Sequence, residues 1–301
     1  MHYLWLLGLF ILPCFAALKE CKSDEDKIQG CVDKEYYENG KLKAEGIFKN
    51  DEPDGLAKMY YQSGKLQLEM PFQNGKLHGL MKEYYENGKT KAEILWENDK
   101  QERIKMYYEN GTLQEESSRN GARKMYYQSG KLELEGTLKD GNPIGITKVY
   151  YESGKLRREF IMDDGGQGGV ARAYYEDDNL KEEMPFTYNQ DKTMNGIATM
   201  YHKNGNIAKE TPYKNSRIEG VVKSYDEKGE LFEETSYKDN LKHGTMRMYY
   251  ENGDVFVQAE FENDVPKSGQ CGNGKQLTNA HLLKIQRYFS EGNALQYAIC
   301  E

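Results

Sequence analysis

The chain has 301 residues, a formal net charge of −8 and 30% charged residues, and its mean hydropathy is −0.89. A globular enzyme of this length normally carries a larger aliphatic core, and the interleaved acidic and basic residues argue against the basic stripe of a nucleic-acid-binding surface. The 24 tyrosines, against 2 tryptophans, favour half-buried pleated surfaces, where a ring packs while its hydroxyl stays hydrated.

The N-terminal segment, residues 1–16, has the pattern of a cleavable secretory signal peptide. An apolar run from Leu4 to Leu12 precedes a small-residue site at Cys14-Phe15-Ala16, which predicts cleavage after Ala16. The run is shorter than the ~20 residues that a membrane-spanning helix needs. We therefore expect a secreted or periplasmic mature chain.

Four cysteines remain after this cleavage, and they lie near the two ends of the chain: Cys21, Cys31, Cys271 and Cys300. An even number in an exported protein predicts two structural disulfides, with three connectivities open. The local pairs Cys21–Cys31 and Cys271–Cys300 would close a short loop at each end. A metal site is the competing interpretation, but the sequence has no C-x-x-C motif and few histidines.

A short motif, Tyr-Tyr-x-x-Gly-Lys-Leu, recurs along the chain, in most cases at a step of 24 residues, as from Tyr36 to Tyr60. The first tyrosine of each unit, here called the leading tyrosine, is Tyr36, Tyr60, Tyr84, Tyr107, Tyr126, Tyr150, Tyr174, Tyr201, Tyr225 or Tyr249. The Asn-Gly or Ser-Gly that follows predicts the turn of a hairpin. A second glycine ahead of the leading tyrosine, as at Gly55 and Gly79, predicts the turn between hairpins. We expect an all-β chain of about ten tandem β-hairpins in one long, twisted antiparallel sheet.

Alternation along the strands predicts one apolar and one polar face. A turn centred on Ser63-Gly64 places Tyr61 opposite Leu66. The same register places Met59, Leu68, Ala57 and Met70 on the apolar face, which needs cover from sheet curvature, the terminal segments or a second chain.

On the polar face, Lys58 is predicted to lie opposite Glu69, and the same basic–acidic spacing recurs along the array. These charges are interpreted as determinants of strand register rather than as catalytic carboxylates. The leading tyrosines share this face, either as structural cover or as a binding stripe made of Tyr60, Tyr84, Tyr107, Tyr126, Tyr150, Tyr174, Tyr201 and Tyr225.

These patterns divide the chain into four segments: a signal peptide (1–16), an N-terminal cap (17–32), the hairpin array (33–265) and a C-terminal cap (266–301). In the last segment the residues from Leu277 to Ile285 predict a short helix. A degenerate final hairpin is expected from Tyr288, since repeat arrays need capping units.

The units resemble the MORN-variant repeat, a bacterial relative of the MORN hairpin, in the core YYENGKLKAEG and in the turn from Asn74 to Gly79. The resemblance covers about Asp33 to Asp264. It implies the hairpin fold and a role in scaffolding, protein contact or lipid-surface contact. Some members are regarded as antitoxin components, a role from which the signal sequence of this chain departs.

No catalytic, cofactor-binding or metal-binding residues are predicted. His78 and His243 share a turn position that Asp54 and Glu219 fill in other units, which indicates turn chemistry. The leading functional hypothesis is a non-catalytic exported scaffold that binds a protein partner at or beyond the cell envelope. Alternatives are a module for cell-wall glycan or for a membrane-lipid surface, and an antitoxin or immunity-like protein; nucleic acid is not expected as a partner.

Overall fold

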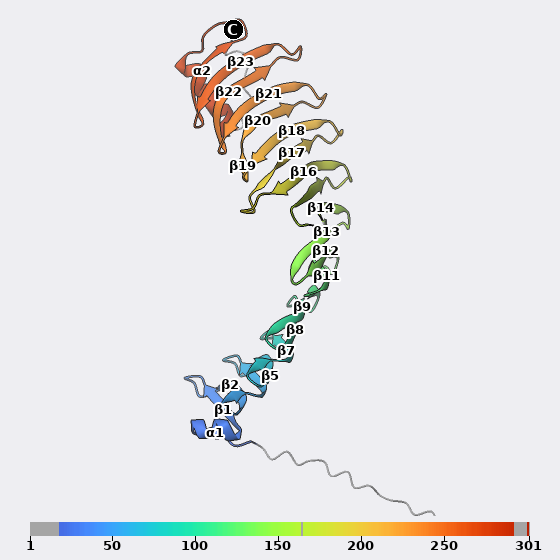
Figure 1. Cartoon of the computed structure of the whole chain (residues 1–301), viewed down its shortest axis with the longest axis vertical. Helices are drawn as coiled ribbons and strands as arrows, with labels where there is room; N and C mark the ends of the chain where they lie inside the picture. The colour runs from blue at the N-terminus through green and yellow to red at the C-terminus, as the bar shows by residue number, and fades with distance from the viewer. Residues whose placement is uncertain (1–17, 164, 292–299, 301) are drawn as a thin grey trace, which may run out of the picture. The chain divides into compact units, whose positions relative to one another are not determined.

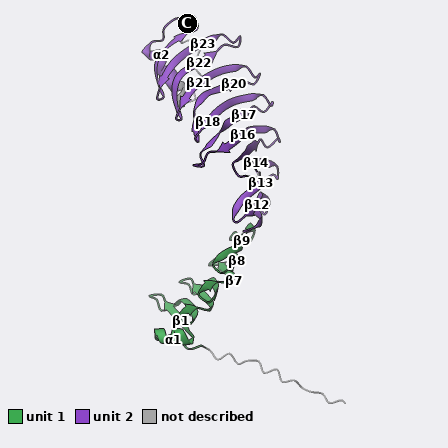
Figure 2. Ribbon diagram, viewed as in Figure 1, with its two compact units in different colours: residues 1–117 green, residues 118–301 purple. Residues whose placement is uncertain are grey.

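The computed structural model describes residues 18–163, 165–291 and 300, so the predicted signal peptide lies outside the described residues. The described chain forms 24 strands of one antiparallel sheet and two α-helices (Figure 1). This confirms the predicted all-β hairpin fold. The chain divides into two compact units, residues 1–117 and 118–301 (Figure 2).

Unit 1 contains one short helix and the strands of the first hairpins. Its elements are α1 (Asp24–Gln29), β1 (Cys31–Tyr36), β2 (Leu42–Lys49), β3 (Glu52–Pro53), β4 (Gly55–Tyr60), β5 (Leu66–Gln73), β6 (Lys76–Leu77), β7 (Gly79–Tyr84), β8 (Thr90–Glu97), β9 (Lys100–Tyr107) and β10 (Leu113–Ser118), whose last residue begins unit 2.

Unit 2 contains the remaining strands and the longer helix. Its elements are β11 (Gly121–Tyr126), β12 (Leu132–Lys139), β13 (Asn142–Tyr150), β14 (Leu156–Met162), β15 (Gly168–Tyr174), β16 (Leu180–Tyr188), β17 (Met194–Tyr201), β18 (Ile207–Lys214), β19 (Arg217–Ile218), β20 (Gly220–Tyr225), β21 (Leu231–Lys238), β22 (Leu241–Tyr249), β23 (Val255–Glu262), β24 (Val265–Cys271) and α2 (Asn279–Glu291).

The hairpin tips differ from the predicted two-residue turn. In the second unit the Tyr61 amide donates to the Lys65 carbonyl at 2.8 Å, and the Gly64 amide donates to the Tyr61 carbonyl at 2.8 Å. Gly64 has a φ of 91°, so the loop is a turn followed by a glycine in the left-handed region, the three-residue hairpin loop. Tyr60, not Tyr61, therefore lies opposite Leu66, and the predicted Tyr61–Leu66 pair is wrong.

The strand register is irregular again between Met59 and Tyr60, where a β-bulge offsets the one-residue change in pairing at Leu66. Beyond it, Met59 lies opposite Leu68 and Lys58 lies opposite Glu69, as predicted. The bulge takes up one residue of β5, because a bulge sets two residues against one. The charge register is confirmed even though the predicted Tyr61–Leu66 pair is wrong.

The turns between hairpins lie earlier in the chain than predicted. Asn74 and Gly75 have φ values of 48° and 76°, as in the mirror-image two-residue turn that matches sheet twist. Gly79 (φ 117°) instead begins β7 beyond the turn, and its lack of a side chain leaves room for Pro71, whose Cγ would lie 3.1 Å from a Cβ there. Positive φ at both turn positions also occurs at Asn50-Asp51, Asn98-Asp99, Asp140-Gly141, Asn215-Ser216, Asp239-Asn240 and Asn263-Asp264.

The sheet has two distinct faces. We call the one with Lys58, Glu69 and Tyr60 and their equivalents the charged face, and the one with Met59 and Met70 and their equivalents the methionine face. Toward the C-terminal end of unit 2 the methionine face is buried by the chain itself, since Val222 is 5% exposed, Thr235 1% and Met246 0%. Met200, on the same face nearer the middle of the chain, is 38% exposed.

Helix α2 covers the last strands. Ile285 is fully buried with Met246, Val257, Ala259 and Phe261 in the core cluster of unit 2. The helix runs from Asn279 to Glu291, longer than the predicted segment that ends at Ile285. Residues 288–291 are helical, so the degenerate hairpin predicted from Tyr288 does not begin there, and residues 292–299 lie outside the described part.

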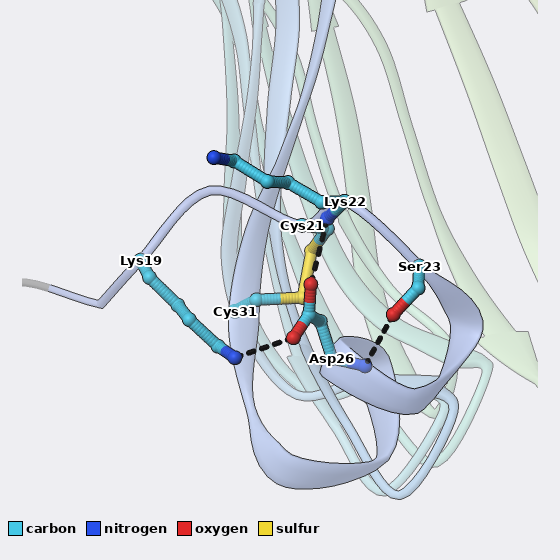
Figure 3. Close-up of polar contacts among 6 residues, drawn as sticks. All are labelled: Lys19, Cys21, Lys22, Ser23, Asp26 and Cys31. Carbon is cyan, nitrogen blue, oxygen red and sulfur yellow. Dashed lines mark hydrogen bonds and ion pairs between the residues drawn. A yellow bond between two sulfur atoms is a disulfide. The ribbon is translucent and has the colours of Figure 1, made fainter.

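The predicted pair of disulfides is confirmed, and of the three connectivities left open the structure has the local one. Cys21–Cys31 joins the segment before α1 to β1, with a Cα–Cα distance of 5.2 Å, and Cys271–Cys300 joins β24 to the residues after α2, with a Cα–Cα distance of 5.6 Å. At the N-terminal cap the Asp26 carboxylate accepts from the Lys19 ammonium and from the Lys22 amide (Figure 3). The ammonium of Lys19 is the main reason that the pKa of Asp26 lies below its usual value.

Candidate functional site

The charged face carries a row of alternating charges that follows the stacking direction of the strands. Glu45 lies opposite Lys34 on one side and Lys58 on the other, and Glu69 lies between Lys58 and Lys82 in the same way. We call this the charge row. Its members are Lys34, Glu45, Lys58, Glu69, Lys82, Glu93 and Lys105 in unit 1, and Lys124, Glu135, Lys148, Glu159, Arg172, Glu183, Thr199, Glu210, Lys223, Glu234 and Arg247 in unit 2.

The arginines of the charge row form ion pairs with one or two carboxylates. Arg172 Nε lies 2.5 Å from Glu183 Oε2, and its Nη1 lies 3.2 Å from Glu159 Oε1. Arg247 Nη1 lies 2.8 Å from Glu234 Oε1. A guanidinium can reach carboxylates on both neighbouring strands because its donors form a planar fork.

The eight tyrosines of the predicted stripe are each the last residue of a strand, β4, β7, β9, β11, β13, β15, β17 and β20. Several donate their hydroxyl to the charge-row carboxylate of the preceding hairpin. The distance is 2.7 Å from Tyr60 to Glu45, 2.9 Å from Tyr84 to Glu69 and 2.5 Å from Tyr150 to Glu135. The same contact joins Tyr107 to Glu93, Tyr174 to Glu159 and Tyr225 to Glu210.

These contacts give the leading tyrosines a structural role that the sequence interpretation had left open. Burial and then the hydrogen bond to the carboxylate raise the pKa of Tyr60, Tyr84, Tyr150, Tyr174 and Tyr225 to about 12. In return, the hydroxyl of Tyr174 is the main reason that the pKa of Glu159 lies below its usual value, and Arg172 lowers it further. Binding of a partner by this stripe stays a prediction.

In six units the second tyrosine makes a different contact, which sequence reasoning missed. Tyr61 donates its hydroxyl to the backbone carbonyl of Tyr84 at 2.7 Å, and Tyr85 donates to that of Tyr107 at 2.7 Å. Tyr37, Tyr127, Tyr151 and Tyr175 repeat the contact. His202 occupies this position in its unit, and its Nε2 lies 2.8 Å from the Tyr225 carbonyl, so a histidine substitutes for a tyrosine as the link to the next hairpin.

The charged face also carries exposed aliphatic side chains, which sequence reasoning had not identified. They lie two residues before the basic position of the charge row and therefore on the same face. We call them the aliphatic row: Leu56, Leu80, Ile146, Ile197 and Val221, with the half-buried Val170 at the same position of its unit. Ile146 is 50% exposed and Ile197 51%, while Leu56, Leu80 and Val221 are also exposed. Their cross-strand partners extend the row, as Leu95 does for Leu80 and Ile161 for Ile146.

The methionine face has shallow hollows where its side chains are small. One of about 440 Å³ lies over Ala44, Gly46 and Ala57, with Met59 and Met70 among its walls. Another of about 190 Å³ lies over Ala171 and Ala173.

The described residues contain no group of three or more His, Cys, Asp or Glu side chains arranged to hold a metal ion. Among the same residues, neither helix has the length and apolar character needed to cross a membrane.

Ten segments of the chain match the family model of the MORN repeat variant: residues 34–50, 53–74, 77–98, 103–118, 119–140, 143–164, 167–188, 194–215, 218–239 and 242–263. The chain belongs to the MORN repeat variant family. The ten segments correspond to the predicted units, so the MORN array of this chain spans residues 34–263. No curated protein matches this MORN repeat chain.

Comparison with solved structures adds local likeness only. The TcdB2-TccC3-Cdc42 crystal structure is 13% identical, with 77% of this chain and 14% of that chain covered and a TM-score of 0.19. The Photorhabdus luminescens Tc holotoxin pore is 12% identical, with 83% and 14% covered and a TM-score of 0.19. Virginiamycin B lyase from Staphylococcus aureus is 12% identical, with 78% and 82% covered and a TM-score of 0.16. The MORN repeat chain thus spans about a seventh of the two toxin chains, and such scores carry no functional argument.

Proposed function

We propose that this MORN repeat protein is a non-catalytic scaffold outside the cytoplasm, and that it binds a protein partner through its charged face. The observation that carries the proposal is the aliphatic row, which leaves Ile146, Ile197 and Val221 exposed beside the charge row. Exposed apolar side chains that are aligned and flanked by charges are typical of protein-interaction surfaces.

The charge row adds specificity to this surface. Basic and acidic groups alternate along it except at Thr199, which lies between Glu183 and Glu210, so a partner must present charges of matching order to avoid placing like charges together. The leading tyrosines add large rings with few rotatable bonds, which bind at a low cost in conformational entropy. Their hydroxyls and the facing carboxylates are already paired with one another, which favours a binding surface over a catalytic one.

The decisive experiment removes the apolar character of the aliphatic row without changing the strands. We expect the combined Ile146→Thr, Ile197→Thr and Val221→Thr variant to fold, because threonine is β-branched and suits a pleated surface. A partner captured by cross-linking from the native envelope or secreted fraction, then purified and titrated by calorimetry, should bind this variant about a hundredfold more weakly.

The matched control is the pair Leu241→Thr and Val265→Thr. These side chains are exposed to a similar degree, 40% and 43%, but lie at the starts of β22 and β24, outside the aliphatic row. Equal affinity of the triple variant and the wild type would contradict the proposal. So would a wild type that binds only liposomes or peptidoglycan.

Export is supported by the two disulfides, because such bonds persist in oxidising compartments outside the cytoplasm. N-terminal sequencing of the exported protein should give a chain that starts at Ala17. A protein retained in the cytoplasm with reduced cysteines would contradict this part of the proposal.

A further inference from the structure

One position in the array breaks the repeat and opens a hollow. The step from Tyr174 to Tyr201 is longer than the others, and the turn between β16 and β17 is an extended loop from Asn189 to Thr193 in place of a two-residue turn. Beside it lies the glycine-rich turn that precedes β15. Together the two loops border an open hollow of about 640 Å³ lined by Gly166, Gln167, Tyr188, Asn189, Gln190 and Lys192.

The frame of the hollow is held by side-chain hydrogen bonds. Asn189 Nδ2 donates to Thr193 Oγ1 at 2.9 Å and to Asn215 Oδ1 at 2.7 Å, and Asn195 Nδ2 donates to Asn189 Oδ1 at 2.8 Å. The Tyr188 amide donates to the Gln167 carbonyl at 2.7 Å and so ties the two loops together. The loop is therefore ordered before any ligand arrives, which lowers the entropic cost of binding.

Unlike the side chains of this frame, other polar groups that line the hollow have no hydrogen-bond partner among the described residues. The side chains of Gln167, Gln190 and Lys192 and the hydroxyl of Tyr188 form no hydrogen bond or ion pair with any other residue in the described part of the chain. Elsewhere in the array the tyrosine hydroxyls largely find a carboxylate or a carbonyl. Tyr188 is 36% exposed, and its ring is held edge-to-face against Phe186, with centroids 5.2 Å apart.

From this arrangement we infer that the hollow binds a carbohydrate chain, with one sugar ring packed on Tyr188 and its hydroxyls bonded to Gln167 and Gln190. A sugar ring presents an apolar C–H surface that suits an aromatic ring. Its hydroxyls both donate and accept, as the carboxamide of glutamine does. A phosphate ligand would need several cations where the hollow offers Lys192, and an apolar ligand would leave the glutamine amides without partners.

A glycan array that includes peptidoglycan fragments tests the inference on the exported chain, with the strongest binder then titrated by calorimetry. We expect saturable binding that Tyr188→Ala weakens about tenfold, as befits the loss of one aromatic contact. The Gln167→Ala, Gln190→Ala double variant should weaken it to a similar degree, and Tyr188→Phe should largely retain it.

Circular dichroism and thermal unfolding verify that each variant folds, and Tyr36→Ala is the matched control, since Tyr36 is also exposed but lies in β1, far from this turn in the sequence. Absence of binding to every glycan on the array overturns the inference. It is also overturned if Tyr188→Ala binds as the wild type does. A protein partner that binds the aliphatic row is unaffected by either result, so the two proposals can fail separately.

Discussion

At the level of single residues, the bond between a leading tyrosine and the carboxylate of the preceding hairpin links consecutive units. Tyr150 and Glu135 make this contact at 2.5 Å in a partly buried setting. Tyr150→Phe keeps the ring and removes only the donor, so it should lower the free energy of unfolding by roughly 1–2 kcal/mol. Chemical denaturation followed by circular dichroism measures the change.

Tyr36 provides the control for this substitution. It is the leading tyrosine of the first unit and is 51% exposed, and among the described residues its hydroxyl has no carboxylate partner. Tyr36→Phe should therefore change stability by less than about 0.5 kcal/mol. Equal losses for both variants would contradict a role for the Tyr150–Glu135 bond.

The raised tyrosine pKa values predict a loss of stability at high pH. A group whose pKa is higher in the folded state favours folding while it is neutral. The contribution of Tyr60 and Tyr84 is fully present below pH 10.0, their ordinary pKa, and is lost as pH rises toward about 12. The melting temperature should fall across this window as tyrosinate absorbance rises. A melting temperature that stays constant through the window would contradict the prediction.

At the level of the hairpin, glycine is needed for two reasons, a positive φ at one position and a lack of space for a Cβ at another. One pair of variants separates the two. Gly64 has a φ of 91° and open space around it, whereas a Cβ at Gly196 would lie 2.2 Å from the Pro185 carbonyl oxygen. Gly64→Ala should cost about 1 kcal/mol from backbone strain alone. Gly196→Ala should cost roughly 3 kcal/mol or more because backbone must move. Thermal unfolding ranks the two, and the reverse order would refute this explanation.

A substitution at His202 is expected to raise the stability of the protein rather than lower it. The other units with this contact use a tyrosine hydroxyl to reach the next carbonyl, so His202→Tyr should keep the link to Tyr225 and pack a larger ring. We expect unchanged or higher stability, by up to about 1 kcal/mol, as for other consensus substitutions. His202→Ala is the paired variant and should be less stable than the wild type in the same denaturation experiment.

The sequence predicted the hairpins, the Lys58–Glu69 register and the terminal disulfides because each rests on short-range spacing. It misplaced the turns, because Ser63-Gly64 fits two loop types and Asn98-Asp99 adopts positive φ without a glycine. The aliphatic row was missed because this face of the sheet was recognised in the sequence by its charged residues alone. The exposure of Ile146 depends on how strands coil, which a one-dimensional pattern does not contain.

At the level of the whole molecule, the array is closed at each end by a disulfide and a helix, and repeat proteins transmit stability mainly between neighbours. Removing one clamp should therefore act locally. Cys271→Ser with Cys300→Ser should cost about 3 kcal/mol and should speed hydrogen exchange in β23, β24 and α2. Exchange in unit 1 should not change.

The reciprocal variant, Cys21→Ser with Cys31→Ser, should open α1 and β1 and leave β23 protected. Mass spectrometry after deuterium labelling compares the two patterns. Uniformly faster exchange in either variant would mean that the array unfolds as one cooperative body, contrary to the expectation.

The leading tyrosines that bond to the preceding hairpin and the second tyrosines that bond to the following one affect how the repeat number of the gene can change. Most units bring one acid, one base and both rings, so a tandem duplication of such units recreates at the new junction the contacts found at the old ones. A deletion that ends within a unit leaves a carboxylate or a carbonyl without its donor. Selection can therefore alter copy number, and with it the length of the presented surface, while the sequence within each unit stays the same.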